Sequence, residues 1–119
     1  MRTYGMSPPS SGGSTIGEIL NILSNFALAG ESRADALYQY LEASRLAYAD
    51  RGAYLGDPEF FDVPLRGLLS PEFAAQRAAL IGPTAPAGPV AAGNPPTSAP
   101  GGSAKPVMRA WPGSCDVWA

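Results

Sequence analysis

The chain has 119 residues, of which 45% are hydrophobic and 15% are charged, and this size fits one domain at most. Its 8 basic and 10 acidic side chains give a net charge of −2, so charge gives no reason to expect nucleic acid or an anionic membrane as a partner. There is no histidine, and the only cysteine is Cys115. These counts exclude an internal disulfide and the Ser/His/Asp and Cys/His ways of activating a nucleophile, and we expect no metal site and no cofactor.

The sequence also bears on where the chain resides. No apolar run of the length of an export signal follows Arg2. Nowhere do about 18 apolar residues run together, so no transmembrane helix is expected. As written, the chain is predicted to be cytoplasmic.

The first predicted helix follows a proline-glycine turn at residues 8–13. Thr15 and Glu18 have the spacing of a capping box, which predicts a helix N-terminus there. Apolar residues then recur at intervals of three and four, as on one face of a helix. Gly30 stands where a left-handed C-terminal stop is expected. The predicted apolar face comprises Ile16, Ile19, Leu20, Leu23 and Ala27.

Two further helices are predicted downstream. Ser32, with a carboxylate three residues on at Asp35, predicts a helix running to about Tyr54. Residues 55–69 are expected to be mainly loop and turn, because glycine and prolines interrupt the pattern. The run 70–72 (Ser-Pro-Glu) predicts a short third helix that ends near Ile81. The apolar residues expected on the second helix are Leu37, Tyr40, Leu41, Ala47 and Tyr48.

The last third of the chain has a different composition. Eight of the 13 prolines lie in residues 83–119, and proline at this density blocks both helix and central strand. We therefore divide the chain into a helical region, 1–82, and an extended, mostly disordered Pro/Gly/Ala-rich tail, 83–119. Two main helices and a short third bury little apolar area to offset the conformational entropy that the chain loses on folding. The pattern therefore predicts part of a domain, whose apolar surfaces need other polypeptide to cover them.

Several motifs have both a functional and a structural interpretation, and the structural one is favoured for each. The run 7–15 leads into a helix N-terminus that would suit an anion, but a turn and cap explain it. Three acidic residues clustered after Gly56 would suit acid–base or metal chemistry, but loop capping explains them. Tyrosines and arginines would suit RNA stacking, but core tyrosines beside surface arginines explain them. These residues are Asp57, Glu59 and Asp62, then Tyr38, Tyr40, Tyr48 and Tyr54 with Arg45 and Arg51; Trp111 and Trp118 flank Cys115 without evident chemistry.

Three ordered motifs together are more specific than any one of them. They are residues 4–13 (YGMSPPSSGG), 18–23 (EILNIL) and 47–58 (AYADRGAYLGDP), with 62–65 (DVPL) continuing the pattern. In this order and at these intervals they closely resemble the γ-glutamyltransferase (glutathione hydrolase) family over about residues 4–94. The matching part of the family is the C-terminal part of the large subunit.

The resemblance implies a fragment of an N-terminal-nucleophile hydrolase with a layered αββα fold. One precursor of this family cleaves itself into a large and a small subunit. The new N-terminal threonine of the small subunit attacks the γ-glutamyl bond of glutathione or a related donor, and the γ-glutamyl group then passes to water, an amino acid or a peptide. The threonine's own α-amine serves as the base, so the absence of histidine does not argue against this family.

The sequence departs from the family pattern near its C-terminal end. Thr84 and Thr97 lack the Thr-Thr-His-like context of the family's cleavage junction, and no likeness is visible beyond about Pro96. One hypothesis is that the chain beyond about residue 97 is translated in a shifted frame or belongs to a broken gene. We assign no catalytic residue, leave substrate-binding residues unknown, and expect the chain to be inactive alone.

The resemblance also implies partners. These are the large-subunit core and the small subunit of a γ-glutamyltransferase, with a glutathione-type donor bound only by the full enzyme. Full-length relatives are often exported. The alternative is a non-enzymatic helical interaction module or complementing fragment; a small enzyme using Cys115 or the carboxylate group is disfavoured because neither has an activating partner.

Overall fold

The structure is a computed structural model that describes residues 4–96 of the chain. In chain order its helices are α1 (Gly12–Leu23), the 3-10 helix η1 (Leu28–Gly30), α2 (Arg33–Tyr54), α3 (Leu65–Leu68) and α4 (Pro71–Ala78). No strand occurs within residues 4–96, so the prediction of a mostly α-helical chain is confirmed. The predictions for 97–119, including Thr97, Trp111, Cys115 and Trp118, lie outside the described residues.

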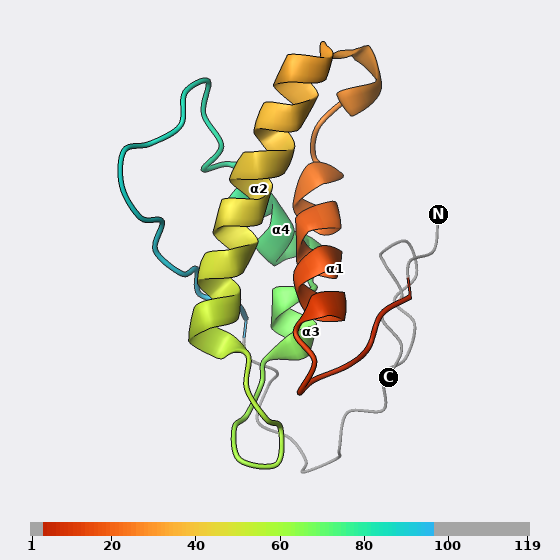
Figure 1. The fold of residues 1–119 in the computed structure, drawn as a ribbon, viewed down its shortest axis with the longest axis vertical. Coiled ribbons are helices and arrows are strands. Elements are labelled where there is room, and N and C mark those ends of the chain that lie inside the picture. The colour runs from red at the N-terminus through yellow and green to blue at the C-terminus, as the bar shows by residue number, and fades with distance from the viewer. Residues whose placement is uncertain (1–3, 97–119) are drawn as a thin grey trace.

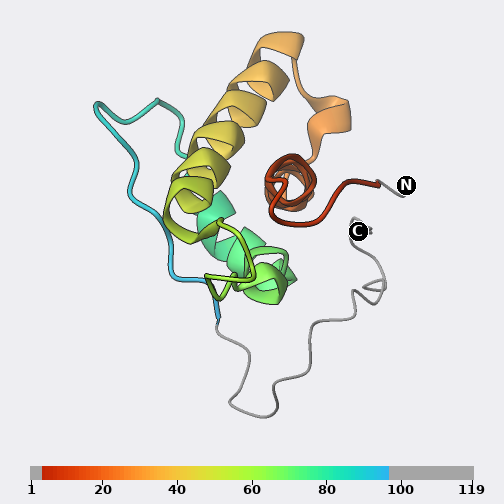
Figure 2. The same ribbon diagram turned by 60° about the horizontal axis from the view of Figure 1, so that its bottom comes forward.

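Helices α1 and α2 form an antiparallel pair joined through η1, as Figure 1 shows. Helix α4 packs against both of them, and α3 lies beside the first turns of α1. Figure 2 shows α1 end-on, with α2 and the α3–α4 segment on one side of it. The three longer helices therefore enclose a single core between them.

Two of the predicted helix starts are confirmed by side-chain caps. Ser32 Oγ accepts a hydrogen bond from the Asp35 N–H, and Ser70 Oγ accepts one from the Phe73 N–H; each distance is 3.2 Å. Such a bond satisfies a donor that the helix itself leaves unpaired. Helix α2 also ends at Tyr54, as expected.

The predicted capping box of the first helix is wrong. Helix α1 begins at Gly12, and its N-cap residue Ser11 makes no side-chain capping bond. Thr15 and Glu18 are both buried within the helix, 4% and 2% exposed. The helix ends at Leu23, so Gly30 is the end of η1 and does not stop α1.

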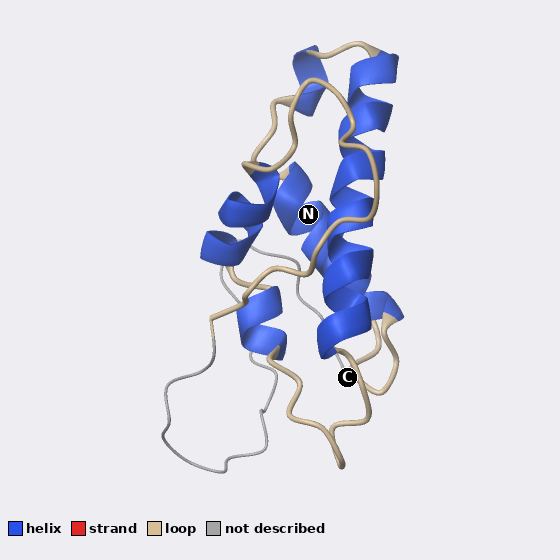
Figure 3. Cartoon of the chain, turned by 90° about the vertical axis from the view of Figure 1, so that its left-hand side faces the viewer, coloured by secondary structure: helices blue, strands red, loops and turns tan. Residues whose placement is uncertain are grey.

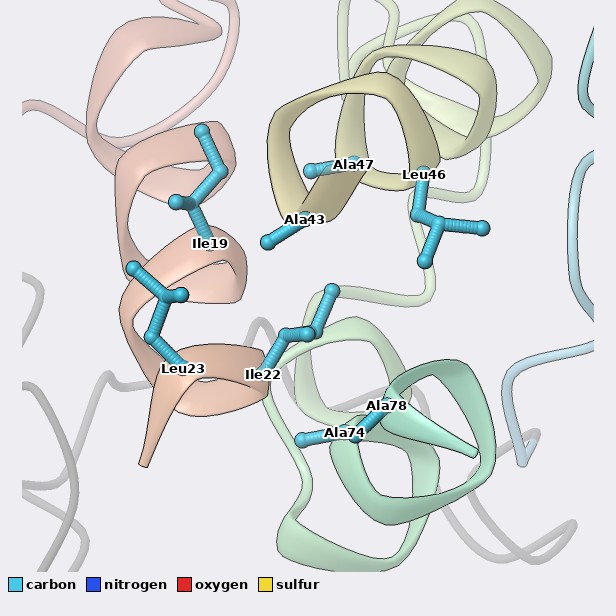
Figure 4. Close-up of a cluster of buried hydrophobic side chains, with 8 residues drawn as sticks. All are labelled: Ile19, Ile22, Leu23, Ala43, Leu46, Ala47, Ala74 and Ala78. Atoms are coloured by element: carbon cyan, nitrogen blue, oxygen red, sulfur yellow. The ribbon is translucent and has the colours of Figure 1, made fainter. Parts of the chain in front are cut away.

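The core is built where the three longer helices meet, and Figure 4 shows its side chains pointing into the space between them. Large side chains from α1 pack against small ones from α2 and α4, which lets the helix backbones approach closely. Its members are Ile19, Ile22, Leu23, Ala43, Leu46, Ala47, Ala74 and Ala78. The apolar face predicted for α1 is only partly confirmed, because Ile19 and Leu23 are buried whereas Ile16 is 51% exposed.

Helix α2 carries most of its large apolar side chains on the side away from the core, Leu46 being the one that is buried in it. Of the residues predicted to be its apolar face, only Ala47 is buried. The others lie on one side of the helix and are about half exposed; we call them the outer face of α2, and they are Leu37, Tyr40, Leu41 and Tyr48. The prediction is wrong because it followed the leucines and tyrosines of one side, whereas the core uses two alanines and Leu46 of the other.

The connection from α2 to α4 is mainly loop, as predicted, with one correction. Residues 65–68 form the short helix α3. Its Gly67 and Leu68 are buried, and Leu68 is 2% exposed. Asn21 of α1 donates a hydrogen bond to the carbonyl oxygen of Leu69 at 3.0 Å, so this turn is attached to α1.

Residues 82–96, which we call the strap, run as an extended segment along α2 (Figure 3). Tyr38 Oη donates to the Gly82 carbonyl oxygen at 2.9 Å, and Tyr54 Oη donates to the Gly93 carbonyl oxygen at 2.7 Å. Pro95 is buried. The side chains of the helices thus supply residues 82–96 with hydrogen-bond partners that the composition of the strap does not reveal.

Within residues 4–96, none of the helices combines the length and the apolar character that a membrane span requires. The 22-residue helix α2 is the longest, and it carries charged side chains along its length.

Candidate functional site

The described residues contain one buried group of ionisable side chains, formed by Glu18, Asp50 and Arg77. We call it the buried cluster. Each residue comes from a different helix, α1, α2 and α4 respectively. Their exposed fractions are 2%, 0% and 4%. Charged groups are seldom buried to this extent unless they are paired.

Asp50 and Arg77 form the ion pair at the centre of this cluster. Asp50 Oδ2 lies 2.8 Å from Arg77 Nε, although the angle is not that of an aligned hydrogen bond. Arg77 Nη2 donates to the carbonyl oxygens of Leu46 and Ala91, each at 3.1 Å. The guanidinium therefore links α4 to α2 and to the strap.

Glu18 occupies the α1 side of the cluster. The pKa of its carboxyl is raised to about 10, chiefly by burial and then by the hydrogen bond and the charge of Asp50, against the opposing effect of Arg77. Glu18 therefore keeps its proton at neutral pH. The cluster then holds one neutral acid, one carboxylate and one guanidinium, so its charges balance.

The helical repeat accounts for how these residues reach one another. Asp50 lies three and four positions after Ala47 and Leu46, so it continues the buried face of α2. Arg77 follows Phe73 and Ala74 at the same intervals on α4. Its guanidinium also lies over the Phe73 ring, 5.9 Å from the centroid, a geometry in which the ring face attracts a cation.

The cluster has the chemistry of a structural connection. It holds carboxyl groups and a guanidinium but no thiol, hydroxyl or amine nucleophile activated by a base. One Oε atom of Glu18 is buried without a hydrogen-bond partner. The Asp50 carboxylate uses its other oxygen, Oδ1, to accept a hydrogen bond from the Gly93 N–H of the strap. This contact brings the strap into the same network.

The segment at the start of the first helix, for which an anion site was the less favoured interpretation, does not gather binding groups. Ser10 N–H bonds back to the Ser7 carbonyl oxygen in a turn, and Ser14 Oγ donates to the Ser11 carbonyl oxygen. Arg51 Nε donates to Ser11 Oγ at 2.9 Å. The structural interpretation, a turn leading into a helix, describes this segment.

The segment after Gly56 that carries the three clustered acidic residues forms a turn. Asp57 Oδ1 accepts a hydrogen bond from the Glu59 N–H at 3.0 Å. Asp57, Glu59 and Asp62 are all exposed. No set of three or more potential metal ligands comes together anywhere in residues 4–96. Loop capping is thus the role that the geometry supports.

The four tyrosines of α2 do not form a nucleic-acid face, but they are not core residues either. Tyr40 and Tyr48 are 48% and 59% exposed, and Tyr38 and Tyr54 bond to the strap. The prediction of core tyrosines is therefore wrong. Arg45 contacts both Glu42, at 2.8 Å, and the Gly88 carbonyl oxygen of the strap, at 2.8 Å.

Sequence analysis did not identify the buried cluster. The sequence pattern makes Glu18 half of a capping box and Asp50 only a member of the motif 47–58, and it does not single out Arg77. A usable signal was present: Asp50 and Arg77 each follow apolar residues at helical spacing, and Glu18 lies one turn before Ile22 on a third helix. Charged residues at core positions of three neighbouring helices must neutralise one another, and here a proton on Glu18 makes that possible.

Comparison with known proteins gives a consistent result. A family model described as "Gamma-glutamyltranspeptidase" matches residues 1–106. The glutathione hydrolase proenzyme of Escherichia coli (strain K12) is 49% identical over 75 residues, which cover 61% of this chain and 13% of that protein. Acylase ACY 1 proenzyme of Pseudomonas sp. (strain V22) is 39% identical over 79 residues, 65% of this chain and 14% of that protein.

Solved structures give the same picture. Helicobacter pylori gamma-glutamyltranspeptidase matches with a TM-score of 0.63 and 39% identity over 67% of this chain and 24% of that chain. Cephalosporin acylase from Bacillus halodurans matches with a TM-score of 0.54 and 33% identity over 59% and 13%. The chain thus spans only a small fraction of the length of these relatives. The family match also extends past Pro96, where no likeness was visible in the motifs.

Proposed function

Because this chain belongs to the gamma-glutamyltranspeptidase family, we propose that it is a structural segment of a γ-glutamyl-transferring, glutathione-hydrolysing enzyme and contributes no catalytic group of its own. The segment is proposed to correspond to the C-terminal part of the large subunit in a layered αββα fold. Its partners would be the large-subunit core and the small subunit. A glutathione-type donor would bind only to the assembled enzyme.

The outer face of α2 is the observation that carries this proposal. Leu37 and Leu41 are 53% and 52% exposed, although the opposite side of the same helix is fully packed. A helix that is apolar on both sides is typical of the interior of a larger structure. Relatives that are several times longer than this chain provide the polypeptide that would cover this face.

The described threonines support the absence of a nucleophile in this segment. Thr15 lies inside α1 and is 4% exposed. Thr84 lies in the exposed first part of the strap. Neither stands in the Thr-Thr-His-like context of the family's cleavage junction, so we expect neither to gain the free α-amine that serves as the base in this family's mechanism. The proposed frame shift beyond about residue 97 concerns only the part of the chain outside the described residues.

A chromogenic γ-glutamyl anilide provides the direct test of activity. We expect the purified chain to release no more chromophore than a boiled sample does. Turnover above that control, retained through an additional purification step, would contradict the proposal, because it would require a nucleophile within these 119 residues.

The alternative, a helical interaction module with an unrelated partner, rests on the same exposed face. Analytical ultracentrifugation at micromolar concentration tests whether that face causes the chain to self-associate. We expect self-association of the parent chain, and less of it in a Leu41→Glu variant. A monomeric parent that melts cooperatively would count against both uses of the outer face.

A further inference from the structure

The strap is held at successive points along α2. Near its start, Tyr38 bonds to the Gly82 carbonyl oxygen at 2.9 Å. In its middle, Arg45 Nη2 donates to the Gly88 carbonyl oxygen at 2.8 Å. Towards its end, Tyr54 bonds to the Gly93 carbonyl oxygen at 2.7 Å. The strap and the helix therefore run in the same direction, and each hold joins residues about forty positions apart in the sequence.

The contact at Gly93 differs from the other two because it also involves a buried side chain of the core. The Gly93 N–H donates to the carboxylate of Asp50, which is 0% exposed. Arg77, the ion-pair partner of Asp50, donates to the Ala91 carbonyl oxygen of the same strap segment. One buried ion pair thus binds a strap donor with its anion and a strap acceptor with its cation.

The fit at this point leaves no room for a side chain. A Cβ added to Gly93 would lie 2.8 Å from the Phe73 ring and 3.1 Å from Arg77 Cδ. Further along, a Cβ on Gly67 of α3 would lie 2.2 Å from the carbonyl oxygen of Pro96. The strap is therefore in direct backbone contact with α3 and α4 as well as with α2.

We propose that the Asp50–Arg77 ion pair is a latch that holds the strap on the helices, and that the strap opens as a unit when the latch is broken. The strap contributes no residue to the hydrophobic core cluster, and only Val90 packs against that cluster from it. Its release therefore leaves the packing of α1, α2 and α4 in place. The latch fixes the path of the polypeptide up to residue 96, and this holds whether or not the chain assembles into an enzyme.

Amide hydrogen exchange of the full chain, followed residue by residue by NMR, tests this inference. The reporter of the strap is the amide of residue 93, and the reporters of the core are the amides of Ile22 and Ala47. Three variants weaken the strap in different ways: Asp50→Asn, Gly93→Ala and Tyr54→Phe. Their controls are Asp62→Asn, Gly82→Ala and Tyr48→Phe. These controls change the same residue types at exposed positions, and a Cβ at Gly82 meets no neighbouring atom.

Each variant has an expected outcome. Tyr54→Phe removes one hydrogen bond, so exchange at residue 93 is expected to become about 2- to 10-fold faster. Gly93→Ala forces the strap away from Phe73 and Arg77, and we expect an increase of about 10-fold or more. Asp50→Asn leaves Arg77 without its counter-charge and is expected to have the largest effect. The control variants leave exchange at residue 93 unchanged.

The core reporters separate a latch from general destabilisation. If exchange at residue 93 accelerates while Ile22 and Ala47 stay protected, the strap opens as a separate unit and the inference is supported. If the core accelerates equally in Gly93→Ala and Tyr54→Phe, or if residue 93 is unaffected in both, the inference is wrong. These two variants decide the question even if Asp50→Asn does not fold.

Discussion

The two sides of α2 differ in the burial of their apolar side chains, and most of the larger ones lie on the exposed side. The side that faces α1 and α4 carries Ala43, Leu46 and Ala47, together with Asp50, and all of them are at most 3% exposed. The outer face carries larger apolar side chains that are about half exposed. Small residues let helices approach closely, so the inner side forms the core of this segment. The larger residues of the outer face remain available for contact with other polypeptide.

Replacing a leucine on each side of α2 is the strongest test of this comparison. Leu46→Ala leaves a cavity in the core and is expected to lower the free energy of unfolding by about 2–5 kcal/mol. Leu41→Ala is the matched change on the outer face, where Leu41 is 52% exposed, and it is expected to change stability by no more than about 0.5 kcal/mol. Urea unfolding of the full chain measures both.

Equal losses of unfolding free energy at positions 41 and 46 would contradict this comparison. They would mean that the outer face is already packed, in this chain or in a self-associated form. Repeating the measurement at several protein concentrations distinguishes the two, because only self-association makes stability depend on concentration.

The buried acid facing the inner side of α2 predicts a dependence of stability on pH. The pKa of Glu18 is raised from 4.5 to about 10 in the folded chain, so between these values the folded state holds a proton that the unfolded state has lost. The stabilisation is complete below about pH 4.5 and is lost as pH rises towards 10, by at most about 1.4 kcal/mol per pH unit. Asp50 of α2 and Arg77 of α4 are the charged groups that face Glu18.

Glu18→Gln removes the titrating proton while keeping a neutral side chain of the same shape. We expect urea midpoints of this variant to fall less steeply between pH 6 and pH 9 than those of the parent chain, a range that lies between the two pKa values. Glu59→Gln, at an exposed position, serves as the control and should keep the parent slope. Parallel slopes for parent and Glu18→Gln would show that Glu18 does not hold a proton in the folded chain.

The smallest effects are expected at the helix caps, which lie outside the comparison of the two faces. Ser70→Ala removes a buried capping bond and Ser32→Ala an exposed one, so each should cost about 1 kcal/mol, with the larger loss at Ser70. Ser11→Ala should cost no more than about 0.5 kcal/mol, since Ser11 makes no capping bond. Thermal unfolding followed by circular dichroism would rank the three, and a larger loss at Ser11 than at Ser70 would contradict the assignment of the caps.

Local signals in the sequence were sufficient where the structure is itself local. The caps at Ser32 and Ser70, and the C-terminal end of α2 at Tyr54, depend on residues within a few positions of one another. The buried cluster could not be predicted in this way, because Glu18, Asp50 and Arg77 meet only when three helices pack. The contacts of the strap could not be predicted for the same reason: its hydrogen-bond partners lie on α2, far away in the sequence.

The latch also has a consequence for the order of folding. The hydrogen bonds between α2 and the strap close loops of 39 to 44 residues, and the latch draws its side chains from helices that must already be adjacent. Loop closure of this length is entropically costly before the helices supply the contacts that compensate for it. The strap should therefore dock after the rate-limiting step of folding. Substitutions at Gly93 would then accelerate unfolding while leaving the folding rate nearly unchanged.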